Sequence, residues 1–118
     1  MEPEPEVAVR ADQLLQTHTV WWGGTCLLSL DGELDIATAP LLDRAVTSIL
    51  AAGPDLLCLG LTALAFCDVT GLHALHRLTD QTRAARTHLH LAGLHPRLRY
   101  TLARLETLSP WTPPVLQD

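Results

Sequence analysis

Apolar residues recur along the chain with two different periods, and these periods separate expected strands from expected helices. Leu14–Trp22 and Thr25–Asp31 read as two strands, and Gly23-Gly24 between them is a typical hairpin turn. Asp55–Gly60 is almost wholly apolar, as expected for a strand that is covered on both faces. His88–Ala92 alternates polar and apolar residues, which indicates a strand with one polar face. The pattern therefore predicts four strands, the first two of them antiparallel.

Three segments between these strands have helical spacing. Thr38 is placed to cap the first helix, Pro40 falls in its first turn, and Gly53-Pro54 ends it. A second helix is expected from about Thr70 to Arg86, and a third over Pro96–Leu105. The expected inward residues of the first helix are Leu42, Ala45, Val46, Ile49 and Leu50. Those of the second are Leu72, Leu75, Leu78, Thr79, Thr82 and Ala85.

This order of elements predicts an α/β protein. Because strand–helix–strand connections give parallel pairing and the hairpin adds an antiparallel strand, we expect a mixed β-sheet with helices packed mainly on one face. Residues 1–12 are expected to be a flexible acidic tail and residues 109–118 a proline-rich tail, with one domain over residues 13–108. Trp111, in the second tail, is a candidate to fold back onto the domain.

Composition narrows the function. The chain has 118 residues and 47% of them are hydrophobic, which suits one domain with one core. Its net charge is −5, but three of the acids lie in the first six residues, and the eight cations are scattered arginines. We therefore expect no direct contact with nucleic acid, which requires clustered cations. No apolar run is long enough to span a bilayer and no secretory signal is present, so we expect a cytoplasmic protein without membrane contact.

Cysteines and histidines complete no recognisable metal site. Cys26, Cys58 and Cys67 are odd in number and lie among apolar neighbours, which suggests buried thiols rather than disulfides. The histidine pairs His73/His76 and His88/His90 have spacings that permit ligation, but each lacks further ligands nearby. Since the chain also lacks the usual nucleotide and hydrolase motifs, we expect no metal, no cofactor and no catalytic residue.

Two short segments depart from the core-building pattern. Asp31-Gly-Glu-Leu-Asp35 holds three carboxylates, and in an extended chain Glu33 and Asp35 would point the same way. Phe66-Cys-Asp-Val-Thr-Gly-Leu72 leads from a loop into the second helix, where Asp68 or Thr70 could cap the free N–H groups. Such segments usually meet at one edge of the sheet. They suit a docking surface for a cationic partner better than catalysis, and a phosphate at the helix start would be stabilised there.

At these segments the sequence resembles STAS domains, typified by bacterial anti-sigma factor antagonists. Leu30-Asp-Gly-Glu-Leu-Asp-Ile-Ala-Thr-Ala-Pro40 is similar to the first signature of the family, and Leu64-Ala-Phe-Cys-Asp-Val-Thr-Gly-Leu-His-Ala-Leu75 to the second. Leu91-Ala-Gly-Leu-His-Pro-Arg-Leu-Arg99 resembles the approach to the third helix. The three segments follow the family order and cover roughly residues 14–108, so the resemblance implies a STAS-like mixed sheet.

The resemblance also implies a regulatory binding protein rather than an enzyme. Antagonists of this family bind an anti-sigma factor that is also a serine kinase, and thereby free a sigma factor for transcription. The kinase phosphorylates the antagonist at the start of the second helix, and this partner switching ends the complex. Partner contact is then expected along the edge formed by Asp31–Thr38 and Cys67–Leu75. Its candidate residues are Glu33, Asp35, Thr38, Asp68, Val69, Thr70, Gly71 and Leu72.

One position departs from the family pattern. The residue that the kinase normally phosphorylates is a serine, and Val69 stands in its place. Either Thr70, the neighbouring hydroxyl, is phosphorylated instead or the protein has lost the switch, and we favour the loss. A protein without the switch would act as a constitutive antagonist, a scaffold or a decoy.

The tryptophans support an alternative function. Trp21, Trp22 and Trp111 could line an apolar site, which would make the protein a STAS scaffold or a carrier of a small ligand or lipid. Trp21 and Trp22 are adjacent in a strand and must face opposite sides. We prefer the interpretation that one of them is exposed at an edge or packs against a second copy of the chain in a homodimer.

Overall fold

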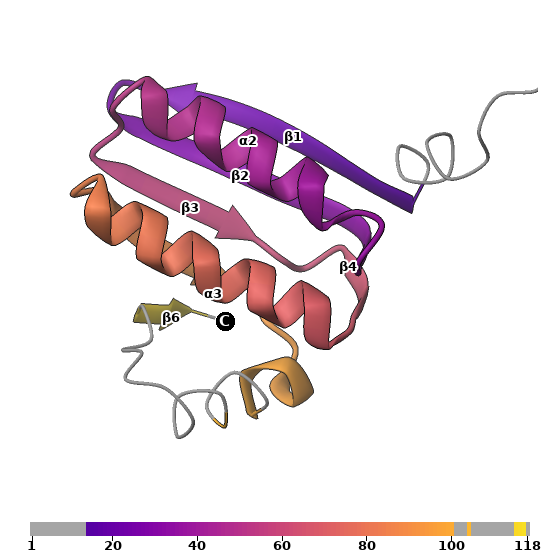
Figure 1. Cartoon of the computed structure of the whole chain (residues 1–118). Coiled ribbons are helices and arrows are strands. Elements are labelled where there is room, and N and C mark those ends of the chain that lie inside the picture. Colours follow the sequence, from indigo (N-terminus) through magenta and orange to yellow (C-terminus); the bar gives the residue numbers. More distant parts are fainter. Residues whose placement is uncertain (1–13, 101–103, 105–114, 118) are drawn as a thin grey trace, which may run out of the picture.

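A computed structural model describes residues 14–100, 104 and 115–117, and within these residues it contains one mixed sheet and two long helices (Figure 1). The strands are β1 (Leu15–Trp22), β2 (Thr25–Leu34), β3 (Leu56–Gly60), β4 (Leu64–Cys67), β5 (His88–Ala92) and β6 (Val115–Gln117). The helices are α2 (Ala39–Ala51) and α3 (Val69–Ala84). Residues 96–100 are also helical, whereas most of the remainder of the expected third helix lies outside the described residues.

The sheet follows the order β1-β2-β3-β5-β6. β1 and β2 are antiparallel and joined at Gly23-Gly24, as the sequence predicts, and the other pairs are parallel. β4 was expected to be loop, and this expectation was wrong. β2 runs three residues further than expected, to Leu34, and past an irregularity at Gly32 it pairs with β4. Since β3 and β4 pair with successive parts of the same edge of β2, β4 continues the line of β3.

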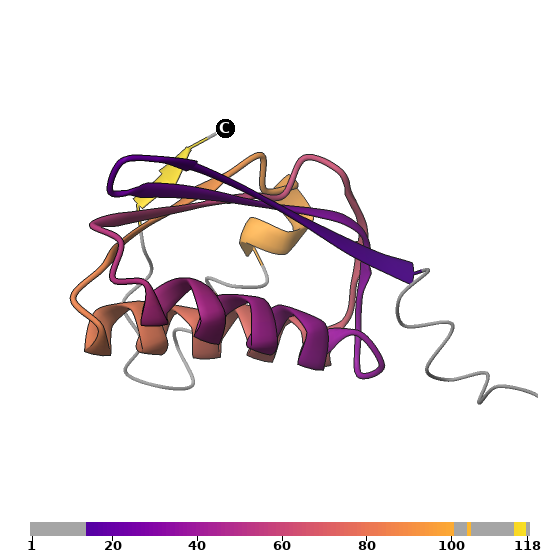
Figure 2. The ribbon, with the colours of Figure 1, turned by 90° about the horizontal axis from the view of Figure 1, so that it is seen from above.

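The core lies between one face of the sheet and the two helices. Figure 2 shows α2 and α3 side by side on one face of the sheet, in agreement with the predicted fold class. Alternate residues of β2 and β3 point into this layer and are fully buried, and the stripes of α2 and α3 meet them. The largest buried side chains include Leu28, Leu30, Leu57, Leu59, Leu42, Val46, Leu75 and Leu78. Ala85 was expected on the inner face of α3, but it is exposed because the helix ends at Ala84.

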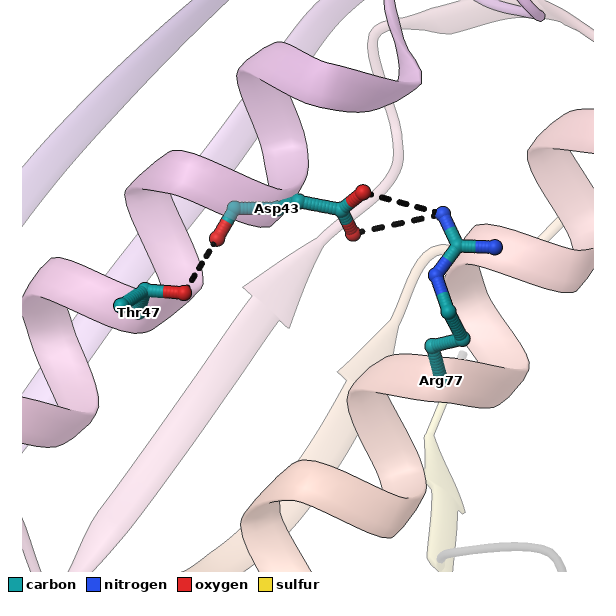
Figure 3. A network of polar contacts seen from close by, with 3 residues as sticks. All are labelled: Asp43, Thr47 and Arg77. Carbon is teal, nitrogen blue, oxygen red and sulfur yellow. Dashed lines mark hydrogen bonds and ion pairs between the residues drawn. The ribbon is translucent and has the colours of Figure 1, made fainter.

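A surface ion pair links the two helices. The guanidinium Nη2 of Arg77 on α3 lies 3.0 Å from a carboxylate oxygen of Asp43 on α2 (Figure 3). The hydroxyl of Thr47 donates to the backbone carbonyl of Asp43 at 2.9 Å. Both charged side chains are more than a third exposed, so solvent screens the pair and its contribution to stability is about 0.5 kcal/mol.

The opposite face of the sheet has no described helix over it. Because paired residues share a face, the register places Val20, Leu27, Cys58 and His90 in one row across it, from β1 to β5. Trp21 and Trp22 are both exposed, on opposite faces of β1. Residues 1–12 and Trp111 lie outside the described residues, whereas 115–117, expected in the proline-rich tail, form β6.

Candidate functional site

The two segments singled out by the sequence lie side by side at the end of β2 and β4. Glu33 pairs with Phe66 and Leu34 with Cys67 in the parallel ladder. Just beyond the ladder, the backbone N–H of Asp68 donates to the carbonyl of Leu34 at 3.2 Å. The start of α3 is therefore held directly against the loop that leads from β2 into α2. We call this edge, formed by residues 33–38 and 66–72, the switch edge.

Asp35, rather than Thr38, supplies the side chain that orders the start of α2. Its carboxylate Oδ1 accepts hydrogen bonds from the backbone N–H groups of Ala37, at 2.9 Å, and Thr38, at 3.1 Å. β2 ends at Leu34, so the extended chain in which Asp35 would point the same way as Glu33 does not reach Asp35. The carboxylate turns back into its own loop instead.

Thr38 occupies the N-cap position of α2, but its side chain makes no capping hydrogen bond, contrary to the prediction. The hydroxyl is fully buried. It donates to the carbonyl of Glu33 at 2.8 Å and accepts from the N–H of Asp35 at 2.9 Å. Thr38 therefore closes the loop between β2 and α2 and fixes the position of Asp35.

At the second segment, Asp68 caps α3. Its Oδ1 accepts from the N–H of Gly71 at 2.9 Å, one of the two alternatives that the sequence left open. Val69 is the first residue of the helix and its side chain is 62% exposed, whereas Thr70 is half-buried. The first residue of α3 is therefore on the surface, but it carries no hydroxyl.

Gly71 and Leu72 are buried and hold α3 against β2. A Cβ on Gly71 would lie against the carbonyl oxygen of Leu34 and 2.8 Å from the sulfur of Cys67, so only glycine allows this approach. Leu72 belongs to the core. Both are candidates for partner contact, which stays a prediction, and in the structure both are buried and position α3 against β2.

Exposed apolar side chains are the feature of the switch edge that sequence reasoning missed. Ile36, in the loop before α2, is 75% exposed, and Phe66 on β4 is 50% exposed. With Val69 they place three large apolar side chains on the same two segments as Asp35 and Asp68. The signal in the sequence was Ile36 itself, an apolar residue in a short polar loop without a helical or strand partner.

The surroundings of the switch edge raise the pKa of one thiol, that of Cys67. Burial, and then the negative charge of Asp68, raise the pKa of Cys67 to about 12, so this thiol stays protonated at neutral pH. Burial also raises the pKa of Cys26. All three cysteines are free, but only Cys26 is fully buried, so the expectation of three buried thiols was wrong. Within the described residues, no group of three or more His, Cys, Asp or Glu side chains is arranged to hold a metal ion.

A small cavity adjoins the switch edge. It has a volume of about 280 Å³ and lies between β4 and the helical residues 96–100. Phe66, His95 and Leu98 are among the residues that line it. The described helices include none that is long and apolar enough to cross a membrane.

The fold and this edge are those of a STAS domain. The family described as "STAS domain" matches residues 17–111, so the chain belongs to the STAS domain family. No relative was found among curated proteins.

Solved structures of related proteins support the same assignment. An anti-sigma factor antagonist from Mycobacterium paratuberculosis is 26% identical with a TM-score of 0.66, over 84% of this chain and 86% of that one. Unphosphorylated SpoIIAA, also an anti-sigma factor antagonist, is 17% identical with a TM-score of 0.68, over 88% and 87%. A sulfate transporter family protein from Wolinella succinogenes is 22% identical with a TM-score of 0.68, over 84% and 80%. The last two likenesses concern the fold alone.

Proposed function

We propose that the protein is an anti-sigma factor antagonist that acts in the cytoplasm and binds an anti-sigma factor with serine kinase activity through the switch edge. The observation that carries the proposal is the exposure of Ile36, Phe66 and Val69 at the place where the family signatures meet. Exposed apolar side chains rimmed by polar groups are typical of protein–protein contacts. The similarity to an antagonist at 26% identity supports the same class of partner.

The partner is expected to contact apolar side chains first and carboxylates second. Asp35 and Asp68 each use one carboxylate oxygen to order a helix start, which leaves the other oxygen for a cationic group of the partner. The two carboxylates therefore orient the partner and raise the rate of association, and the apolar side chains supply most of the affinity.

Phosphorylation is not expected to release this complex. SpoIIAA has been solved in unphosphorylated and phosphorylated forms, so that relative does accept a phosphate. In this chain the exposed first residue of α3 is Val69, and the only neighbouring hydroxyl, on Thr70, is half-buried. We infer a constitutive antagonist, which stays bound while the kinase and ATP are present.

Surface substitutions test the docking edge. Ile36→Arg and Val69→Arg place a cation on exposed positions, so both variants should fold normally yet bind the anti-sigma factor at least about tenfold more weakly. Val20→Arg is the matched control, because Val20 is also exposed but lies on the uncovered face of β1. Titration calorimetry with purified anti-sigma kinases of the same genome gives the affinities. Equal affinity for the two edge variants and the wild type would refute the docking edge.

The cavity beside β4 favours one second candidate, a STAS module that binds a small ligand. Its volume of about 280 Å³ is at the lower end of ligand sites. Native mass spectrometry of the purified protein would reveal a bound molecule, and substitution of Leu98 by tryptophan should then displace it. A mass equal to that of the bare chain, with no change on adding a cell extract of small molecules, would refute this candidate.

A further inference from the structure

Two chemically reactive side chains face each other on the uncovered side of the sheet. Cys58 on β3 and His90 on β5 are directly opposite in the parallel ladder. The sulfur of Cys58 lies 4.0 Å from Nδ1 of His90, so the thiol can donate to this nitrogen when Nδ1 carries no proton. Both residues are half-buried, which leaves part of each side chain in contact with solvent.

The other two thiols have no comparable surroundings. Cys26 is fully buried on the core face of β2. Cys67 lies beside the carboxylate of Asp68, and its sulfur donates to the backbone carbonyl of Asp68 at 3.6 Å. Both settings disfavour the thiolate, the form that reacts. Cys67 is also half-buried and lines the cavity beside β4, so Cys58 differs from it by the imidazole nitrogen beside its sulfur and by the absence of an adjacent carboxylate.

The residues next to Cys58 on this face of the sheet are small in one direction along β3 and large in the other. The next residue of β3 on the same face is Gly60, and its partner across the ladder is Ala92. In the other direction along β3, the next residue on this face is Leu56, and its partner across the ladder is His88. Gly60 and Ala92 themselves carry no large side chain, and the atoms nearest to a Cβ built on Gly60 are Ser29 Oγ at 3.4 Å and Leu27 Cδ1 at 3.8 Å. A small molecule therefore reaches the half-buried sulfur alongside Leu27 and Ser29.

We propose that Cys58 is a site of covalent modification by low-molecular-weight disulfides, with His90 as the group that receives the thiol proton. The proton of Cys58 passes to Nδ1 of His90 and the sulfur attacks one sulfur of the small disulfide. A bond forms between Cys58 and that sulfur while the original S–S bond breaks. The leaving thiolate takes up the proton, so Cys58 is oxidised to a mixed disulfide and half of the reagent is reduced to a thiol.

The pair lies on two inner strands of the sheet, on the face opposite the buried Leu57 and Leu59, rather than at the switch edge. The modification therefore does not depend on the proposed function. It would place a polar adduct among Leu27, Leu56 and Val20 and so change the surface that this face offers.

Glutathione disulfide in limiting amount tests the proposal on the whole chain at neutral pH. Intact mass and peptide mapping should find the first adduct on Cys58, and Cys58→Ser should remove the fast phase. His90→Gln should lower the rate about a hundredfold, the lower end of what a positioned general base contributes. The matched control is His88→Gln, because His88 is on the same strand and face but opposite Leu56, and this variant should react like the wild type.

Circular dichroism establishes that each variant is folded before its rate is compared. A first adduct on Cys67 or Cys26 would overturn the assignment of the site. Equal rates for His90→Gln and the wild type would overturn the role of His90, and equal loss in both histidine variants would do the same.

Discussion

Substitution of Gly71 by alanine gives a prediction in which the direction of the stability change alone decides whether α3 packs closely against β2. Alanine normally stabilises a helix by about 1 kcal/mol relative to glycine, so Gly71→Ala in α3 would raise stability if the site were open. In the structure the site around Gly71 is closely packed, not open. The new Cβ would press on the carbonyl oxygen of Leu34 and lie 3.0 Å from its carbonyl carbon, and backbone cannot rotate away as a side chain can.

The magnitude follows from these two opposing terms. Overpacking against backbone costs about 3 kcal/mol, the upper part of the usual range, and the helix propensity offsets about 1 kcal/mol of it. The net loss is about 2 kcal/mol, or a melting temperature lower by roughly 8 °C for a domain of this size. Moving α3 outward would also lengthen the hydrogen bond between the N–H of Asp68 and the carbonyl of Leu34.

Thermal and urea unfolding of the wild type and Gly71→Ala measure this loss. Ser48→Ala serves as the control, because Ser48 is exposed on α2 and its replacement tests helix propensity without a clash. The control should be as stable as the wild type or slightly more so. If Gly71→Ala were equally stable or more stable, the close packing of α3 against β2 would be wrong.

Three further predictions concern the buried hydroxyl of Thr38, the ion pair between α2 and α3, and the thiol of Cys67. Thr38→Val should lower the free energy of unfolding by about 2 kcal/mol, because it leaves the carbonyl of Glu33 and one N–H without partners, whereas Thr38→Ser should restore most of it. Asp43→Asn and Arg77→Ala in a double-mutant cycle should give a coupling of about 0.5 kcal/mol that falls with salt, and a coupling above 2 kcal/mol would contradict the exposed pair. Because the pKa of Cys67 is raised from 9.0 to about 12, stability from its neutral thiol is present below pH 9 and lost as the pH rises towards 12. Chemical unfolding across this range should show a steeper loss for the wild type than for Cys67→Ala, and parallel curves would speak against the raised pKa.

Much of the fold could be predicted from local signals. The Gly23-Gly24 turn identifies the hairpin, and the apolar stripe from Leu42 to Leu50 identifies α2. β4 could not be found in this way. Its four residues carry no strong alternation, and they pair only because β2 continues past Gly32 to offer a free edge. The partner of a short strand is a tertiary property, which no local pattern contains.

The proximity of the two segments was predictable from the sequence, but their detailed contacts were not. The family signatures locate both segments, and the ladder of β2 and β4 brings them together. The sequence could not show that Asp35 orders the start of α2 while the hydroxyl of Thr38 closes the loop before it. Either side-chain oxygen can cap a helix, and only the path of the loop decides between them. Ile36 and Phe66 were missed for a related reason, because an apolar residue in a sequence is normally expected to be buried.

One measurement tests the central claim, that this protein holds its kinase partner without a phosphate switch. The complex with an anti-sigma kinase is incubated with ATP and followed by size-exclusion chromatography and phosphopeptide mapping, with Val69→Ser as the comparison. The account predicts that the wild-type complex persists and carries no phosphate, while Val69→Ser becomes phosphorylated at residue 69 and dissociates. Phosphate on Thr70 with release of the wild-type protein would contradict it.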